Sequence, residues 1–110
     1  MGHIKRMVET FAALGEPTRL RIVELLRSGP RPVNDIGERL ELTQPQVSKH
    51  LRVLKDSGLV EERRQGTQRL YRARPEPILE MRRFLETFWD ESLMAIKQAA
   101  EADSRGGKGG

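Results

Sequence analysis

Residues Thr43 to Val60 read TQPQVSKHLRVLKDSGLV, and this stretch decides the fold. Thr43 followed three residues later by Gln46 is a capping-box pattern, and Pro45 is tolerated in a first helical turn. We therefore expect a helix to begin at Gln44. Gly58 is the kind of residue that is favoured just past a helix C-terminus, so we expect the helix to end there.

The expected helix has two chemically different faces. At about 100° per residue, Val47, Leu51 and Leu54 fall together and predict the side that faces the core. The opposite side and the exposed start of the helix carry amides, a hydroxyl and cations: Gln44, Gln46, Ser48, Lys49 and Arg52. Gln can pair with adenine, and Lys or Arg can reach guanine or phosphate, so this side suits a DNA major groove. A merely solvated helix surface has a similar composition, and the helix alone does not separate the two interpretations.

Apolar spacing and turn residues predict further elements on both sides of this helix. We expect helices at about 4–14, 17–27, 33–40 and 76–102, and extended segments at 59–64 and 68–73. The run Gln65-Gly66-Thr67 between the two extended segments indicates a β-hairpin. The second helix, which includes Leu20, is apolar around most of its circumference and is expected to be buried. Together these elements predict a mainly α fold with a small β-hairpin, in the order of a winged helix-turn-helix.

Length and composition limit the possible classes of protein. A chain of 110 residues allows one domain, which we place at 1–102, with a Gly-rich tail at 103–110 that is expected to be disordered. The absence of Cys excludes a disulfide scaffold and a thiolate metal site. No apolar run reaches the roughly 20 residues that span a bilayer, and the start MGHIKRMVETF does not read as a signal peptide. We therefore expect no membrane association and a cytoplasmic location.

Positive charge is concentrated in the middle of the chain. Residues 44–74 hold eight Lys or Arg against three Asp or Glu, whereas residues 75–110 hold five against seven. A localised basic zone is typical of nucleic-acid binding. Four of its cations lie in the expected hairpin and are candidate contacts to a phosphate backbone or minor groove: Arg63, Arg64, Arg69 and Arg72. The alternative is that these arginines only keep an edge hairpin soluble.

Three runs of the sequence resemble the ArsR/SmtB transcription repressors. These runs are LGEPTRLRIVELL (14–26), NDIGERLELTQPQVSKHLRVLKDSGLV (34–60) and RRQGTQRLYR (63–72). The resemblance spans roughly residues 7–100. It implies a homodimer that binds a palindromic operator in double-stranded DNA with two recognition helices and two wings. It also implies that the first and last helices form the dimer interface.

The apolar residues of the first and last helices agree with a dimer. They present more apolar surface than a three-helix core with a small wing can cover, and such patches usually find a partner. The candidate interface residues are Met7, Val8, Phe11, Phe84, Leu85, Phe88, Trp89 and Leu93. The alternative is that the last helix folds back onto its own domain.

The ligand positions that metal-sensing members of this family use do not match. Where arsenic-type sensors carry Cys-Val-Cys, this sequence has Pro32-Val33-Asn34, and its last helix has carboxylates but no His. Carboxylates alone make a poor transition-metal site. His50 lies at the edge of the core-facing side, which predicts a packing or hydrogen-bonding role. We expect no metal and no cofactor, and the effector ligand is left unknown.

Two other functions compete with sequence-specific repression. A winged helix can also serve as a protein-interaction module whose basic face binds an acidic partner. An enzyme has little support, because no cluster of Cys, His and carboxylates is apparent.

Overall fold

The computed structural model describes residues 2–106, except for the side chains of residues 89, 90, 92 and 104–106. These residues form two compact units, one ending at Leu79 and the other beginning at Glu80, and each is described by itself. The prediction that 1–102 is a single domain stays a prediction.

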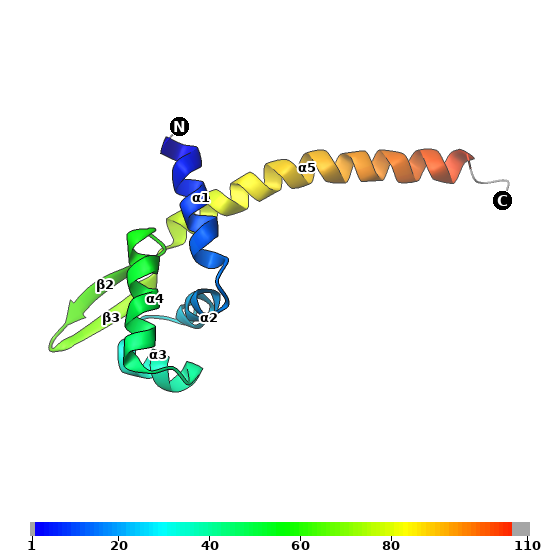
Figure 1. The fold of residues 1–110 in the computed structure, drawn as a ribbon. Helices are drawn as coiled ribbons and strands as arrows, with labels where there is room; N and C mark the ends of the chain where they lie inside the picture. Colours follow the sequence, from blue (N-terminus) through cyan, green and yellow to red (C-terminus); the bar gives the residue numbers. More distant parts are fainter. Residues whose placement is uncertain (1, 107–110) are drawn as a thin grey trace. The chain divides into compact units, whose positions relative to one another are not determined.

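The first unit contains the winged helix-turn-helix elements that the sequence predicts, in the same order (Figure 1). Its helices are α1 (Gly2–Leu14), α2 (Pro17–Leu26), α3 (Val33–Leu40) and α4 (Gln44–Asp56). Its strands are β1 (Arg31–Pro32), β2 (Val60–Gln65) and β3 (Gln68–Ala73). Helix α5 (Pro75–Gly106) begins in this unit and makes up the described part of the second. It continues beyond Asp103, where the sequence predicted a disordered tail, and residues 107–110 lie outside the described residues.

The sheet has three strands rather than the two that the sequence predicts. Its order is β1-β3-β2 and all pairing is antiparallel, with Arg31 opposite Tyr71 and Pro32 opposite Leu70. A two-residue strand carries no periodicity, so β1 is defined only by its tertiary pairing. The predicted three-residue hairpin turn is also wrong. Gln65 pairs with Gln68, which leaves two turn residues, and Gly66 adopts a φ of 63° at the first of them.

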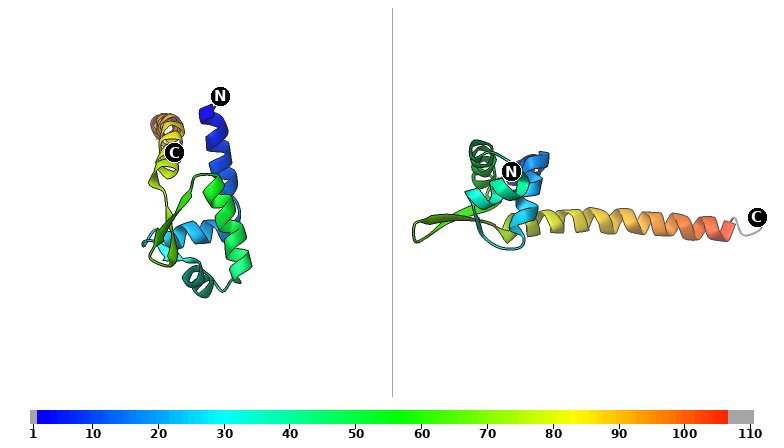
Figure 2. Two further views of the ribbon diagram at one scale, coloured as in Figure 1. Left: turned by 90° about the vertical axis from the view of Figure 1, so that its left-hand side faces the viewer. Right: turned by 90° about the horizontal axis from the view of Figure 1, so that it is seen from below.

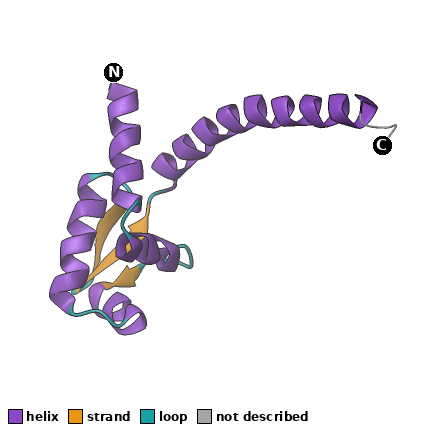
Figure 3. Cartoon of the chain, turned by 45° about the vertical axis from the view of Figure 1, so that its right-hand side comes forward, coloured by secondary structure: helices purple, strands orange, loops and turns teal. Residues whose placement is uncertain are grey.

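Helices α2, α3 and α4 pack against the strands and close a small core (Figure 3). Its fully buried side chains come from the three helices, the start of β2 and the residue before it: Ile22, Ile36, Val47, Leu51, Leu54, Leu59 and Val60. Among the apolar residues of α2, which are expected to be buried, Ile22, Val23 and Leu26 are buried but Leu20 is 50% exposed. The hairpin β2–β3 projects beyond the helices of this unit, as the right-hand view of Figure 2 shows.

A tight turn joins α3 to α4 and fixes their crossing. Glu41 ends α3 with a φ of 58°, a left-handed conformation that is unusual for a residue other than Gly. The Leu42 N–H donates to the Gly37 carbonyl oxygen over 2.9 Å. A Cβ atom on Gly37 would lie only 2.9 Å from the Leu42 carbonyl oxygen. The turn therefore needs a residue without a side chain at position 37.

Helix α4 begins and ends as the sequence predicts. Thr43 is its N-cap, and both hydrogen bonds of a capping box with Gln46 are present. Beyond its C-terminus Gly58 has a φ of 81°, and the Leu59 N–H donates to the Leu54 carbonyl oxygen over 2.9 Å. This reversal directs the chain from α4 straight into β2, which places the hairpin beside the helix.

Candidate nucleic-acid interface

The outward side of α4 is polar and cationic. Val47, Leu51 and Leu54 are buried, as the helical spacing predicts. The five residues expected on the other side are all exposed: Gln44, Gln46, Ser48, Lys49 and Arg52. The helix therefore offers amide, hydroxyl and cationic groups to any surface that approaches it.

Gln46 differs from its neighbours because its carbonyl group is already engaged. Its Oε1 accepts from the Thr43 N–H over 2.8 Å and from the Thr43 hydroxyl over 3.1 Å. The Gln46 N–H donates in turn to Thr43 Oγ1 over 3.3 Å. Because the oxygen is used within the cap, Gln46 cannot make a bidentate amide pair with adenine without breaking the cap.

His50 is half-buried on the inner edge of α4, where the sequence predicts a packing or hydrogen-bonding role. Its Nδ1 lies 3.5 Å from Arg19 Nη1 and 3.7 Å from Glu16 Oε2. Glu16 is the N-cap of α2 and accepts from the Arg19 N–H over 2.9 Å. That backbone hydrogen bond, with the nearby His50 and Arg19, holds the pKa of Glu16 below its ordinary value. These contacts tie α4 to the start of α2.

The four hairpin arginines divide between two faces. Directly opposite residues of an antiparallel pair share a face. Arg64 lies opposite Arg69, and both share a face with Glu62, which bonds to Lys55 of α4. Arg63 and Arg72 lie on the other face of the hairpin. Only Arg64 and Arg69 are therefore on the side of the hairpin that turns toward α4.

Acidic residues partly neutralise the hairpin. Glu62 Oε1 accepts from Lys55 Nζ over 2.9 Å, and its Oε2 lies 3.3 Å from Arg69 Nε. The Lys55 hydrogen bond lowers the pKa of Glu62, and the carboxylate raises the pKa of Lys55 in return. Arg72 pairs with Glu61 in the same way and lowers the pKa of that carboxyl. Both carboxylates are therefore ionised at neutral pH and offset part of the positive charge.

Four cationic side chains of α4 and β2 are not held in ion pairs with any described residue. Among the described side chains, no ion pair involves Lys49, Arg52, Arg63 or Arg64. Two of them come from α4 and two from β2. Exposed cations on adjacent elements that are not held in ion pairs are what a phosphate backbone attracts.

A hollow of about 360 Å³ joins the outer side of α4 to the hairpin. Gln44 and Ser48 line it from α4, and Arg69 and Tyr71 line it from β3. The sequence did not single out Asn34 and Gln68, which also line this hollow. In the sequence, Asn34 and Gln68 look like ordinary solvated polar residues. Only the packing of α3 and the hairpin beside α4 identifies them as lining residues.

The residues expected at a dimer interface are largely exposed in the single chain. On α1, Val8 is 60% exposed, and Met7 and Phe11 are half-buried. On α5, Phe88 is 63% exposed, and Phe84, Leu85 and Leu93 are exposed as well. The side chain of Trp89 lies outside the described residues.

Neither a metal cluster nor a membrane span is found in the described part of the chain. Its His, Asp and Glu residues do not form a group of three or more that could hold a metal ion. Within the same residues no helix is long and apolar enough to cross a bilayer.

A capped, cationic helix beside a basic hairpin, on a three-helix core, defines a winged helix-turn-helix transcriptional regulator. Residues 16–62 match the family described as bacterial regulatory protein, arsR family. The chain belongs to this family, which confirms the resemblance to ArsR/SmtB proteins.

Relatives from bacteria support the assignment over most of the chain. The HTH-type transcriptional regulator Rv2034 of Mycobacterium tuberculosis is 37% identical over 93 residues, which are 84% of this chain and 87% of the relative. The transcriptional repressor SdpR of Bacillus subtilis is 35% identical over 60 residues, which are 54% of this chain and 67% of the relative.

A solved structure with the same fold is the homodimeric winged helix-turn-helix DNA-binding domain of a possible ArsR-family regulator from Mycobacterium bovis. It is 32% identical with a TM-score of 0.66, and the match covers 80% of this chain and 82% of that one.

Proposed function

We propose that this protein is a homodimeric transcriptional repressor that binds a palindromic DNA operator in the cytoplasm and has no catalytic role. The observation that carries the proposal is the exposed polar and cationic face of α4, a helix with a capped N-terminus, beside the basic hairpin. The relative SdpR is named as a repressor, which favours repression over activation. A repressor needs only to occupy its operator, and a DNA-binding surface with a dimer interface is sufficient for that.

The contacts to DNA that we propose differ in kind. Gln44, Ser48, Lys49 and Arg52 face the major groove, where amide and cationic groups meet base edges and phosphates. Gln46 contributes through its side-chain N–H₂ group, which can still donate to DNA, and through the cap that orients α4. On the hairpin, Arg64 and Arg69 share the face toward α4 and are the stronger candidates for phosphate contact. Arg63 and Arg72 are the weaker ones.

Two guanidinium groups in directly opposite positions of a hairpin repel each other and favour the binding of an anion between them. Arg64 and Arg69 form such a pair, and of the two only Arg69 makes a direct ion pair, with Glu62. Like charges in directly opposite positions destabilise a hairpin. A phosphate that lies against this face relieves the repulsion, so binding DNA also stabilises the hairpin.

The dimer interface that we propose uses the exposed apolar residues of α1 and α5. A second copy removes these side chains from water, which stabilises the dimer by about 25 cal/mol for each Å² of apolar surface buried. Two-fold symmetry then presents two copies of α4 to two half-sites. We expect these half-sites to be about one helical turn apart or slightly more.

Selection from a random DNA duplex pool tests this function. The expected result is one enriched motif with two-fold symmetry. Lys49→Ala and Arg52→Ala are expected to weaken binding to that motif while the protein remains a dimer in sedimentation. Enrichment of no motif would contradict sequence-specific repression and favour a protein-interaction module instead.

A further inference from the structure

Two hollows beside the start of α4 share three lining residues. The second hollow, of about 240 Å³, lies between α3 and the start of α4, and Glu38 and Leu42 line its far side. Val33, Asn34 and Gln44 line both this hollow and the one beside the hairpin. These three residues therefore form a ridge, made by α3 and α4 together, with a concave surface on each side.

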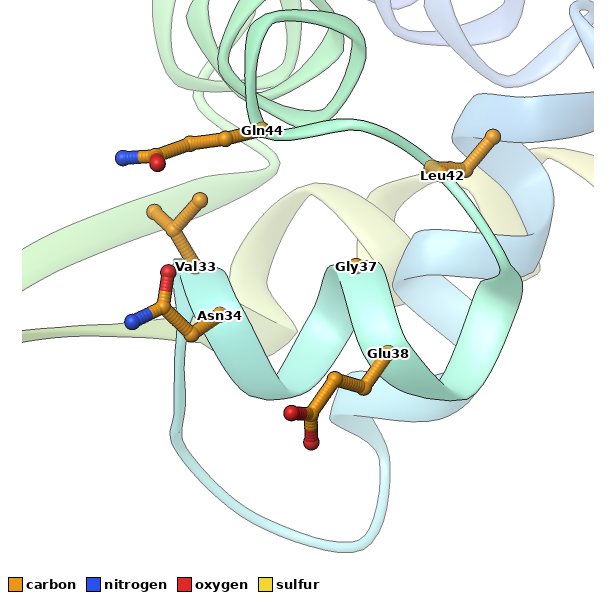
Figure 4. Close-up of a pocket in the computed structure, with 6 residues that line it drawn as sticks. All are labelled: Val33, Asn34, Gly37, Glu38, Leu42 and Gln44. Atoms are coloured by element: carbon orange, nitrogen blue, oxygen red, sulfur yellow. The ribbon is translucent and has the colours of Figure 1, made fainter.

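The ridge combines two amides with an aliphatic group. Figure 4 shows the amides of Asn34 and Gln44 projecting to the same side, with the branched side chain of Val33 between them. Asn34 and Gln44 are exposed, and Val33 is half-buried. Among the described side chains, neither of these two amides has a hydrogen-bond partner, in contrast to Gln46. Both amides therefore keep their full donor and acceptor capacity.

This combination matches what an A·T base pair presents in the major groove. Adenine offers an acceptor at N7 and a donor at N6, which one Asn or Gln amide can bind with both of its groups. Thymine offers its 5-methyl group, which apolar side chains contact. No other base pair presents a methyl group beside this pattern.

The start of α3 is held firmly enough to contribute to recognition. Arg31 Nη1 donates to Asp35 Oδ2 over 2.6 Å, and Arg31 Nη2 donates to Ser28 Oγ over 2.8 Å. Asp35 also accepts from Arg39 Nε over 3.2 Å. Because these contacts join the preceding loop, β1 and α3, the first turn of α3 is positioned before DNA arrives.

We propose that α3 shares in base recognition: Val33 contacts the 5-methyl group of a thymine, and Asn34 and Gln44 bond to the base edges beside it. The inference rests on the proposed function, and it adds two specificity-determining residues outside the recognition helix. The reading surface ends at Glu38, because its carboxylate is repelled by phosphate. Each half-site therefore contains at least one A·T pair at the position that meets α3.

Replacing thymine by uracil in the selected operator tests the methyl contact, since uracil lacks only the methyl group. With each thymine replaced singly, one position in each half-site is expected to lose about fourfold in affinity, the worth of one buried methyl group. Val33→Ala is expected to bind the unmodified operator more weakly. It is also expected to bind the uracil operator as well as the unaltered protein does, and a protein that had merely lost stability would not.

Val53→Ala is the control, because Val53 is another valine of this unit, is 37% exposed and lies near the C-terminal end of α4. It is expected to keep the full sensitivity to uracil. Asn34→Ala, reselected on random DNA, is expected to lose the base preference at a position adjacent to the sensitive thymine.

Two failures are distinguishable. If no motif is enriched, the proposed function itself is wrong. If a palindrome is enriched but has no uracil-sensitive thymine, or if Val33→Ala keeps that sensitivity, the DNA-binding function holds and the role of α3 is overturned.

Discussion

Arg63 and Arg64 provide a pair of cations that tests which face of the hairpin meets DNA. They are neighbours in β2, both are exposed, and no ion pair between described side chains involves either one. They differ in the face that they share: Arg64 is on the side of Glu62 and α4, and Arg63 is on the other. Substituting each by Ala removes the same charge from opposite sides of one strand.

The salt dependence of binding gives the expected magnitude. Each phosphate that a cation neutralises contributes about −0.9 to the slope of log affinity against log salt concentration. A dimer has two hairpins, so Arg64→Ala removes two phosphate contacts and makes the slope shallower by about 1.8. Between about 50 and 200 mM salt, the affinity ratio of unaltered protein to variant is then expected to shrink about twelvefold. Arg63→Ala is expected to leave the slope nearly unchanged.

Fluorescence anisotropy of a labelled operator, titrated at several potassium chloride concentrations, measures both slopes. The reasoning is refuted if Arg63→Ala reduces the slope as much as Arg64→Ala, or if neither variant changes it. The first result would mean that the face of the strand does not matter, and the second that the hairpin does not touch phosphate.

Four further predictions concern the turn, the interface and the charges. Gly37→Ala is expected to lower the unfolding free energy by about 1 kcal/mol in urea denaturation, since overpacking against the Leu42 carbonyl outweighs the gain in helix propensity. Gly15→Ala is the control, because its Cβ would meet backbone oxygens only at 3.4 Å, and it should leave the unfolding free energy nearly unchanged. Glu41→Gly is expected to raise the unfolding free energy by a few tenths of a kcal/mol to about 1 kcal/mol, because Gly adopts the φ of 58° without strain; a loss of stability would contradict this. Phe88→Glu is expected to yield monomers in sedimentation, whereas Leu20→Glu, at an exposed leucine outside the proposed interface, should remain dimeric. The hydrogen bond from Lys55 holds the pKa of Glu62 below its ordinary value of 4.5, so the stability that this carboxylate contributes is present above about pH 4.5 and is lost as the pH falls through the folded-state pKa. Glu62→Gln is therefore expected to lose less unfolding free energy than the unaltered protein between about pH 7 and pH 3. An equal loss would show that this ion pair does not cause the acid destabilisation.

Local chemistry made the recognition helix predictable. The capping box at Thr43 and Gln46, the spacing of the buried residues and the terminal Gly58 all act within a few residues of one another. The same holds for the order of helices and hairpin, and for the family to which the chain belongs. Such signals survive in the sequence because their physical causes are short-range.

Other features depend on which elements meet. Strand β1 exists because Arg31 and Pro32 lie beside β3, and no propensity in two residues can predict that pairing. The sequence predicts one turn residue too many, because only the register of Gln65 with Gln68 fixes the strand ends. The exposure of Leu20 could not be predicted, because composition does not say which side of α2 faces the core.

The sequence by itself determined the type of protein and the polar face that it presents. The tertiary structure decided which members of that face are available. It engaged the carbonyl of Gln46 in the cap, paired Arg69 and Arg72 with carboxylates, and divided the hairpin arginines between two faces. It also brought Val33 and Asn34 beside Gln44, although Asn34 and Gln44 are ten positions apart in the chain. The reason is that the amino-acid type sets the chemistry of a side chain. Packing between distant segments sets which of its hydrogen-bonding groups and charges are unpaired and which residues lie beside it.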